Sequence, residues 1–278
     1  MMRPTVLLAL ILLFSTWSLS AQSLIKPNWQ NPEVVNVNKL PARTTSISYP
    51  TKELAIAANR DASPRKKILN GKWDFAYFEA PAKVPRGIEK PGYAYKGWKD
   101  IPVPSNWELH GYGKPWQRLT HQIWEKKGIK PPYIPQDYNP TGIYKKKISI
   151  PKDWANYQIT LHVGAVSSAL TVWVNGQYVG YGEDNRLPAE FDISPYLTGR
   201  NNTLVFQVSQ WSDGSYLEDQ DHWRMSGITR DVFLEAAPKV QLYDFAVRTE
   251  LDEDYLDAEL QIRPEIVLFE ATDIEGWV

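Results

Sequence analysis

Seventeen residues, WSDGSYLEDQDHWRMSG at 211–227, combine the side chains that acid–base or metal chemistry requires. Paired carboxylates can act as general acid and base, and clustered carboxylates can bind Ca²⁺. The EDQD run at 218–221 lacks the spaced oxygen ligands and the turn glycine of a known calcium loop. The segment leaves open an active site, a metal site, or a frame for chemistry placed elsewhere. Its acidic residues are Asp213, Glu218, Asp219 and Asp221.

Histidines and serines elsewhere in the chain lack the spacing of a zinc site or a nucleophile. No histidine has a partner at the separation that zinc ligands require. None of the three serines considered as a nucleophile has the strand–turn–helix context of a nucleophile elbow. The sequence therefore argues against both kinds of site. The residues concerned are His110, His121, His162, His222, Ser105, Ser167 and Ser212.

The first 21 residues predict export. A short basic start precedes an apolar run at 6–14, and small residues follow at 18–21. This run is too short to span a bilayer, so we interpret residues 1–21 as a cleaved signal peptide and expect no membrane span after cleavage. The expected location is periplasmic or secreted. The chain has no cysteine, so no disulfide framework is available there.

Overall charge gives little support to a nucleic-acid partner. The chain has 31 basic and 32 acidic residues and a net charge of −1. A dedicated nucleic-acid binder normally carries a strong excess of basic residues. We therefore expect no nucleic-acid partner.

The elements that must position these residues are short strands. Residues 22–64 are rich in Asn, Pro, Ser and Lys and predict an extended arm, with Tyr49 and 54–57 as its apolar anchors. Period-two alternation begins at 68–78 and returns at 157–166, 169–182, 189–197, 202–211 and 230–238. Many short alternating strands with almost no helical periodicity predict an all-β, antiparallel sandwich.

Proline marks the stretch between the first strand and the rest. Residues 79–142 are rich in proline, which cannot donate to a sheet ladder, so long surface loops are expected. Loops of this length usually serve binding or interfaces. Trp107, Trp116 and Trp124 stand on these loops. Stacking on sugar, packing against another domain and burial under the arm remain open for them.

A second unit begins after Pro238. Residues 240–251 and 257–264 alternate again and predict the first strands of a further sandwich. Two or three strands cannot bury a face or close an edge. Residues 239–278 therefore predict the truncated start of a domain.

Several segments occur in an order and spacing that resemble the large bacterial β-galactosidases of glycoside hydrolase family 2, from about residue 59 to about residue 264. The resemblance implies a jelly-roll sugar-binding domain at 65–238, followed by the start of an immunoglobulin-like sandwich at 239–278. In that family a catalytic (β/α)₈ barrel of roughly 250 residues comes next and carries both catalytic glutamates. We therefore assign no catalytic residue to this chain. The segments are LNGKWDFAYF, VPSNWELHGYGKP, NPTGIYKK, VSSALTVWVNGQYVGYGEDNRLPAEFDIS and WSDGSYLEDQDHWRMSGITRDV.

One residue of the family's sugar site carries over. The resemblance places Asp184, in GYGEDNRLP, at the galactosyl hydroxyls and at a bound sodium ion whose other protein ligands come from the barrel. A carboxylate suits both roles, because it accepts hydrogen bonds and is a hard oxygen ligand. The alternative is local: Asp184 pairs with Arg186 or caps a turn. The resemblance also implies magnesium in the full-length family and a possible homo-oligomer.

A second family position departs from the pattern. Family members place an asparagine in the loop after GY-x-x-P, and here the matching residue is Leu119. Leucine cannot supply those hydrogen bonds, so either the subsite or the preferred substrate differs. Arg118, Thr120 and His121 are weaker candidates for compensating contacts.

Two functions follow as expectations. The first is the N-terminal sugar-binding part of a secreted β-galactosidase-like hydrolase, which acts on terminal β-galactosides or related glycans when its barrel is present and is inactive alone. The alternative is a stand-alone, lectin-like carbohydrate-binding module. In either case we interpret 211–227 as a frame, in which carboxylates pair with Arg224, Arg230 and loop amides while Trp211 and Trp223 pack the junction.

Overall fold

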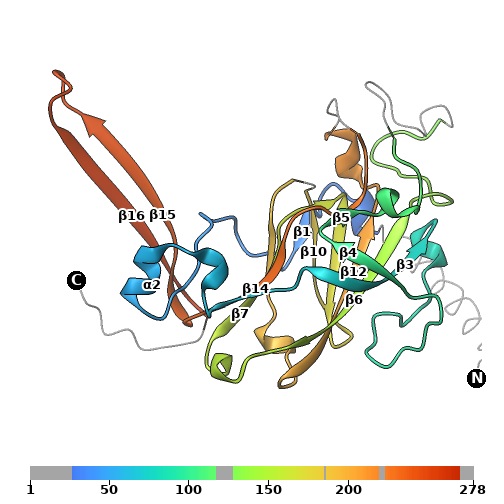
Figure 1. Ribbon diagram of the computed structural model, residues 1–278. Coiled ribbons are helices and arrows are strands. Elements are labelled where there is room, and N and C mark those ends of the chain that lie inside the picture. The colour runs from blue at the N-terminus through green and yellow to red at the C-terminus, as the bar shows by residue number, and fades with distance from the viewer. Residues whose placement is uncertain (1–26, 117–127, 185, 219–222, 270–278) are drawn as a thin grey trace, which may run out of the picture.

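The structure, a computed structural model, describes residues 27–116, 128–184, 186–218 and 223–269. The signal peptide predicted at 1–21 lies outside these residues. The described chain is all-β, as predicted (Figure 1). Its strands are β1 (Asn36–Val37), β2 (Lys66–Ile68), β3 (Gly71–Phe78), β4 (Lys99–Val103), β5 (Ser105–Asn106), β6 (Thr141–Ser149), β7 (Gln158–Val163), β8 (Val166–Ser167), β9 (Ala169–Val174), β10 (Gln177–Glu183), β11 (Ala189–Asp192), β12 (Asn201–Ser209), β13 (Gly227–Ile228), β14 (Val232–Ala237), β15 (Val240–Leu251) and β16 (Ala258–Leu268).

Helical structure in the described residues is limited to short pieces between the strands. One α-helix has six residues, and the rest are single 3₁₀ turns. None of these helices is long and apolar enough to cross a membrane. They are α2 (Lys52–Ala57), η1 (Asn28–Gln30), η2 (Arg60–Ala62), η3 (Pro81–Lys83), η4 (Trp107–His110), η6 (Lys152–Trp154), η7 (Ser194–Tyr196) and η8 (Asp213–Tyr216).

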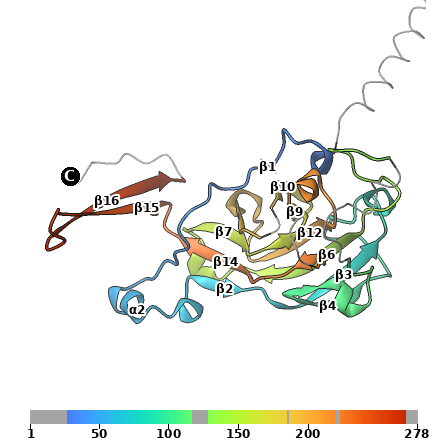
Figure 2. The ribbon, with the colours of Figure 1, turned by 90° about the horizontal axis from the view of Figure 1, so that it is seen from above.

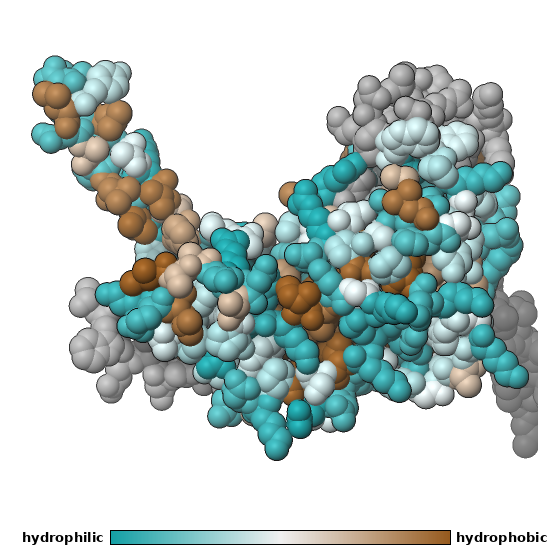
Figure 3. Space-filling model, viewed as in Figure 1, coloured by the Kyte–Doolittle hydropathy of each residue, from teal (hydrophilic) through white to brown (hydrophobic). Residues whose placement is uncertain are grey.

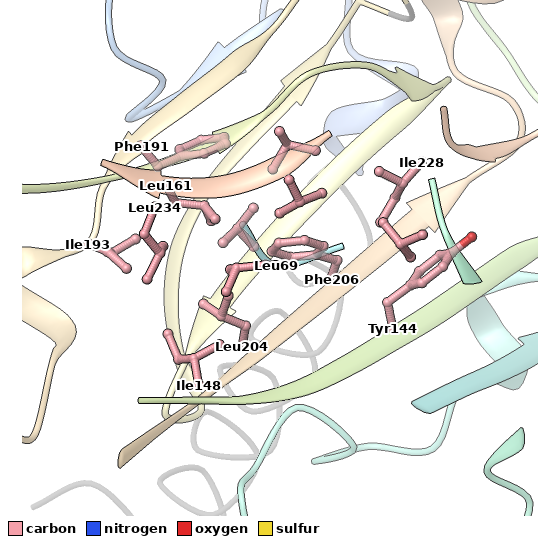
Figure 4. Close-up of a cluster of buried hydrophobic side chains, with 14 of the residues drawn as sticks. Leu69, Tyr144, Ile148, Leu161, Phe191, Ile193, Leu204, Phe206, Ile228 and Leu234 are labelled. Atoms are coloured by element: carbon pink, nitrogen blue, oxygen red, sulfur yellow. The ribbon is translucent and has the colours of Figure 1, made fainter. Parts of the chain in front are cut away.

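Two antiparallel sheets form the sandwich. The larger has the order β1-β10-β9-β12-β6-β3-β4, and the smaller has the order β11-β7-β14-β2. A short sheet, β5-β13-β8, lies beside them. Side chains from both main sheets meet in the core, where Leu204 and Phe206 of β12 lie near Leu161 of β7 and Leu234 of β14 (Figure 4). All four are fully buried, and burying each contributes about 1.5–3 kcal/mol.

Strand β12 shows the period-two alternation of side chains that the sequence predicts. Leu204, Phe206 and Val208 point into the core, as predicted, and all three are fully buried. Val205 on the opposite face is also buried, because the proline-rich loop at 79–98 covers that side of the larger sheet. Part of the stretch predicted as binding loops therefore packs against the sandwich itself.

The turn between β9 and β10 is the tight hairpin that Asn175-Gly176 predicts. Both residues have positive φ, 53° and 79°. Asparagine and glycine tolerate this conformation better than other residues do, which is why the pair marks such turns. The hairpin fixes the register of β10, and therefore the position at which β10 ends.

The arm is built into the sandwich rather than only laid over it. Its strand β1 pairs with β10, and the Asn38 side chain donates to the Val179 carbonyl at 2.8 Å. The predicted anchors at 54–57 are wrong, because they form the exposed helix α2, in which Ile56 is 73% exposed. Figure 2 shows α2 standing apart from the sandwich.

A long hairpin follows the sandwich. Strands β15 and β16 pair with each other along their length. Strand β15 coincides with the strand predicted at 240–251, and β16 overlaps the strand predicted at 257–264. Apolar side chains remain exposed on this hairpin, and they appear as brown atoms on the projecting part of the space-filling view in Figure 3. Val247 is 54% exposed and Ile262 is 59% exposed.

Candidate functional site

Asp184 is the residue directly after β10. Its Oδ1 accepts the backbone N–H groups of Leu187, at 3.2 Å, and Arg186, at 3.4 Å. The turn-capping alternative therefore describes part of what Asp184 does. Its Oδ2 has no hydrogen-bond partner within the part of the chain that the structure describes. One oxygen thus holds the turn, and the other is left for a ligand.

The backbone of Asp184 is in an unusual conformation. Its φ is +141°, a region that side chains other than glycine rarely adopt and that costs about 1–3 kcal/mol. Strain of this kind concentrates at functional sites, where the surrounding structure imposes it. Strand β10 ends directly before this residue, and the two backbone N–H groups that bond to Oδ1 belong to the turn that follows it.

A cavity of about 280 Å³ opens beside Asp184. The arm at 39–43 forms one wall, and Leu187 and Pro188 form another. His162 and Glu190 also line it. The arm and the turn after β10 therefore enclose the same space.

Arg43 anchors that arm wall. Its Nε lies 2.9 Å from Glu190 Oε2, and its Nη2 lies 2.9 Å from Glu235 Oε2. Burial works against the charged guanidinium, but the two carboxylates outweigh it and raise the pKa of Arg43 above its usual range. His162 Nδ1 lies 2.8 Å from Glu190 Oε1, and its ring stacks on Phe233.

The two carboxylates on Arg43 respond in opposite directions. Burial favours the neutral form of Glu190, yet bonds with His162 and Arg43 hold its pKa below the ordinary value. Burial also dominates at Glu235, and Arg43 only partly offsets it, so the pKa of Glu235 is raised. Arg43 is thus the common counter-charge of two buried acids.

A second acid pair lies behind Asp184. Glu183 is 7% exposed and Asp213 is 8% exposed. Burial raises the pKa of Glu183 to about 8; the hydrogen bond from Tyr181 works against this shift, and the charge of Asp213 adds to it. Tyr181 donates its hydroxyl to Glu183 Oε1. Glu183 is therefore protonated at neutral pH and joins β10 to the segment at 211–227.

The described part of the segment at 211–227 packs as the predicted frame, with one correction. Trp211 is 2% exposed and Arg224 lies over its ring at 5.7 Å. Trp223 is 52% exposed, and its packing at the junction with the rest of the molecule stays a prediction. Asp213 faces Glu183 rather than an arginine. Asp219 and Asp221 lie outside the described residues. The 3₁₀ turn η8 is part of this segment, and within it Ser215 Oγ accepts the backbone N–H of Ser212 at 3.1 Å.

Several other candidate residues lie outside the described part of the chain. Arg118, Leu119, Thr120 and His121 lie outside the described residues, as does Trp124. Trp107 is fully buried in the core, 6.1 Å from the Phe75 ring, so of its three open roles sugar stacking is wrong.

No metal centre is formed by the described residues themselves. They contain no group of three or more His, Cys, Asp or Glu side chains placed to hold a metal ion. Asp184 offers one free carboxylate oxygen, which fits one position in the shell of a hard cation but does not complete it. The sodium role of Asp184 stays a prediction.

Sequence reasoning missed Arg43 and Glu183. Arg43 lies in an arm without periodicity, and its partners are 147 and 192 residues away. The family resemblance singles out Asp184 and not the adjacent Glu183, although strand alternation places Glu183 on the same face as the buried Tyr181.

Strain at Asp184 predicts an unusual order of stability. We expect D184G to be more stable than D184A by about 1–2 kcal/mol, because both lose the carboxylate and only glycine relieves the positive φ. Urea unfolding measures the difference. Asp192 is the matched control, since it also accepts a backbone N–H, from Ser194, without a positive φ. There alanine should be the more stable variant, and the same order at both positions would contradict strain at Asp184.

Comparison with known proteins places the sandwich in a family. Residues 66–238 match the family model "Glycosyl hydrolases family 2, sugar binding domain". The chain is 40% identical over 243 residues to a β-galactosidase of Priestia megaterium and 42% identical over 239 residues to one of Vibrio cholerae. These alignments cover 87% and 86% of this chain but 24% and 23% of the relatives, so the chain spans about a quarter of their length.

Solved structures share the fold. A β-glucuronidase of Bacteroides uniformis matches with a TM-score of 0.55 and 23% identity, covering 72% of this chain and 22% of that one. A β-glucuronidase from an uncultured Clostridium matches with a TM-score of 0.51 and 23% identity, covering 72% and 33%. At this identity the likeness concerns the fold alone. From the family model and the β-galactosidase relatives it follows that the chain belongs to glycosyl hydrolase family 2, with residues 66–238 as its sugar-binding domain.

Proposed function

We propose that this chain supplies one contact of a galactosyl-binding site in a secreted β-galactosidase-like hydrolase, through Asp184. The supporting observation is that the two oxygens of its carboxylate differ in their hydrogen-bond partners. Oδ1 holds the turn after β10, while Oδ2 has no partner among the described residues and the backbone is held at a strained φ of +141°. A carboxylate oxygen in this state can accept a sugar hydroxyl and can contribute to a sodium shell.

Bond cleavage is assigned to a part of the polypeptide beyond this chain. Retaining hydrolysis requires two carboxyl groups about 5 Å apart across the scissile bond. Glu183 and Asp213 do not fit, because both are buried, at 7% and 8% exposed. The substrates proposed for the whole enzyme are terminal β-galactosides or related glycans, on the ground of the β-galactosidase relatives.

The isolated chain provides the first test. The purified 278-residue protein is expected to give no turnover of a chromogenic β-galactoside above background. Turnover that a carboxylate substitution abolishes would show that the chain carries its own reaction centre. Titrating the same protein with galactose distinguishes the proposal from the lectin-like alternative. One contact should give no saturation at millimolar galactose, whereas a lectin should saturate and lose binding on D184N.

The role of Asp184 is tested in the whole gene product. The reading frame is expressed to its stop codon, and kcat/KM is measured for the wild type, D184N and D192N. Asparagine keeps an acceptor for Leu187 and Arg186 but removes the charge. We expect D184N to lower kcat/KM by about 10- to 100-fold, since a hydrogen bond to a charged group is worth about 1.5–3 kcal/mol. D192N should change kcat/KM little. Equal losses in both variants, or a whole gene product without hydrolase activity, would contradict the proposal.

A further inference from the structure

A second cavity lies at the end of the sandwich opposite to Asp184. Strand register fixes the two ends: Glu183 and Ser209 both pair with Ala169 at the Asp184 end, whereas Ser149 pairs with Asn201 at the other. The second cavity has a volume of about 460 Å³ and is formed by the chain just beyond that far end. This is within the size range of pockets that hold small organic ligands.

The far-end cavity opens between the two sheets. Residues 150–157 connect β6 of the larger sheet to β7 of the smaller one, and residues 193–200 connect β11 to β12. Both connections and Ile159 of β7 line the cavity. The N–H of Ile150 donates to the Arg200 carbonyl at 2.7 Å and ties the two connections together. The cavity is therefore held by backbone structure on both sides.

The floor of the cavity is apolar. Ile150, Trp154 and Ile159 are all more than 90% buried and form it, with Leu197 beside them. The Trp154 indole N–H is already used, because it donates to the Pro64 carbonyl at 3.1 Å. The floor thus offers contact area and no hydrogen bond from this indole.

The polar groups of the lining are also engaged. Ser194 Oγ accepts the N–H of Ile159 at 2.8 Å, and the Tyr157 hydroxyl accepts from Arg65 at 2.5 Å. No lining residue that the structure describes carries a carboxylate or a carboxamide, which are the side-chain groups best suited to accept sugar hydroxyls. A neutral sugar therefore finds few partners here.

The rim is positively charged. Lys152 lies on one side and Arg200 on the other, both with exposed side chains, and the described lining contains no acidic residue to neutralise them. A cationic rim over an apolar floor is complementary to a ligand that has an apolar ring and one anionic group.

We propose that the far-end cavity binds a small organic anion, with its ring on the floor formed by Ile150, Trp154 and Ile159 and its carboxylate or sulfate between Lys152 and Arg200. This site is separate from the proposed galactosyl contact at Asp184. It would let the sugar-binding domain hold a ligand of a different chemical class from the substrate.

The test uses two ligands of nearly the same shape, one anionic and one neutral. 3-Phenylpropanoate and 3-phenylpropanamide have the same ring and chain length, and NMR titration of the ¹⁵N-labelled 278-residue chain measures both. We expect the carboxylate to bind with a Kd of roughly 0.1–1 mM, in line with the efficiency of small ligands. It should shift amides at 150–159 and 194–200, and the amide ligand should bind roughly tenfold more weakly. Added NaCl should weaken only the carboxylate.

Variants locate the site. Replacing both exposed rim cations, K152Q/R200Q, should reduce carboxylate binding to the level of the amide ligand without affecting the fold. K96Q/K99Q removes two exposed charges, one just before β4 and one at its first residue, and should leave binding unchanged. A155F, at an exposed lining position, should fill the space and abolish binding of both ligands.

The outcomes decide the proposal. Equal affinity for the two ligands, shifts elsewhere in the chain, or no saturation at 20-fold above the expected Kd would each overturn it. D184N should leave 3-phenylpropanoate binding unchanged, so this result is independent of the galactosyl proposal.

Discussion

Replacing Arg43 by alanine is expected to destabilise the folded chain by about 3–5 kcal/mol, because it leaves buried acids without their counter-charge. Glu190 and Glu235 both depend on this guanidinium, at 2.9 Å each, and their side chains are 12% and 4% exposed. Water therefore cannot replace the lost arginine at Glu235. Urea unfolding at pH 7, with the midpoint and slope recorded, measures the change.

Arg60 provides the matched control for Arg43. It is also an arm arginine, but it is exposed and its guanidinium donates to the Thr45 carbonyl at 3.0 Å. We expect R60A to cost less than about 0.5 kcal/mol. Adding E235Q to R43A should recover part of the loss, since the second substitution removes an uncompensated charge. A loss below about 1 kcal/mol for R43A, or no recovery in the double variant, would contradict this account.

In the R43A variant, the arm should also loosen where it lines the cavity beside Asp184. Besides the acids, Arg43 lies over the Tyr243 ring at 5.4 Å, and the Tyr243 hydroxyl donates to the Pro41 carbonyl at 2.5 Å. Losing the guanidinium therefore weakens the link between arm and β15 as well as the link between arm and sandwich. The stability of the arm and the shape of the cavity are thus coupled.

The sandwich could be predicted because its determinants are local. Alternation along β12 and the Asn175-Gly176 turn each depend on residues a few positions apart, and the structure confirms both. Burial of the outer face of β12 could not be read in the same way. It depends on the loop at 79–98, which folds back over the sheet from far away in sequence.

The candidate site was predictable only in part. Asp184 follows from a segment that resembles a family pattern, and the structure adds its strained φ and its free oxygen. Arg43 has no local signal, because a single arginine in an irregular arm looks like any solvated cation. Its importance comes from two partners on different strands, which only the folded chain brings together.

Replacing Glu183 by glutamine is expected to stabilise the chain at pH 8 by about 2–3 kcal/mol, the second large effect that the structure predicts. Protonated Glu183 can both accept from Tyr181 and share a hydrogen bond with Asp213. Glutamine offers the same acceptor and a permanent donor in nearly the same shape. The ionised carboxylate, by contrast, faces the charge of Asp213 in a buried position.

The pH dependence gives the sign of this effect. Below about pH 4.5 Glu183 is protonated in both the folded and the unfolded chain, so its contribution to the free energy of unfolding is fully present. Between about 4.5 and about 8 the unfolded chain ionises and the folded chain does not, and stability falls with rising pH by up to about 1.4 kcal/mol per unit. Above about pH 8 both states are ionised and the loss stops. E183Q should remove this decline.

Glu190 supplies a control of opposite sign. Its pKa is held below the ordinary value in the folded chain by His162 and Arg43, so its contribution is present above the unfolded pKa and is lost as the pH falls. E190Q should therefore destabilise at pH 8, and the penalty should shrink on acidification. Urea midpoints at pH 3, 4, 5, 6, 7 and 8 for the wild type and both variants separate the two acids, because the Glu190 contribution is lost below about pH 4.5, whereas the Glu183 contribution is lost between about pH 4.5 and about pH 8. If E183Q and the wild type lost stability in parallel over this range, the buried proton would not lie on Glu183.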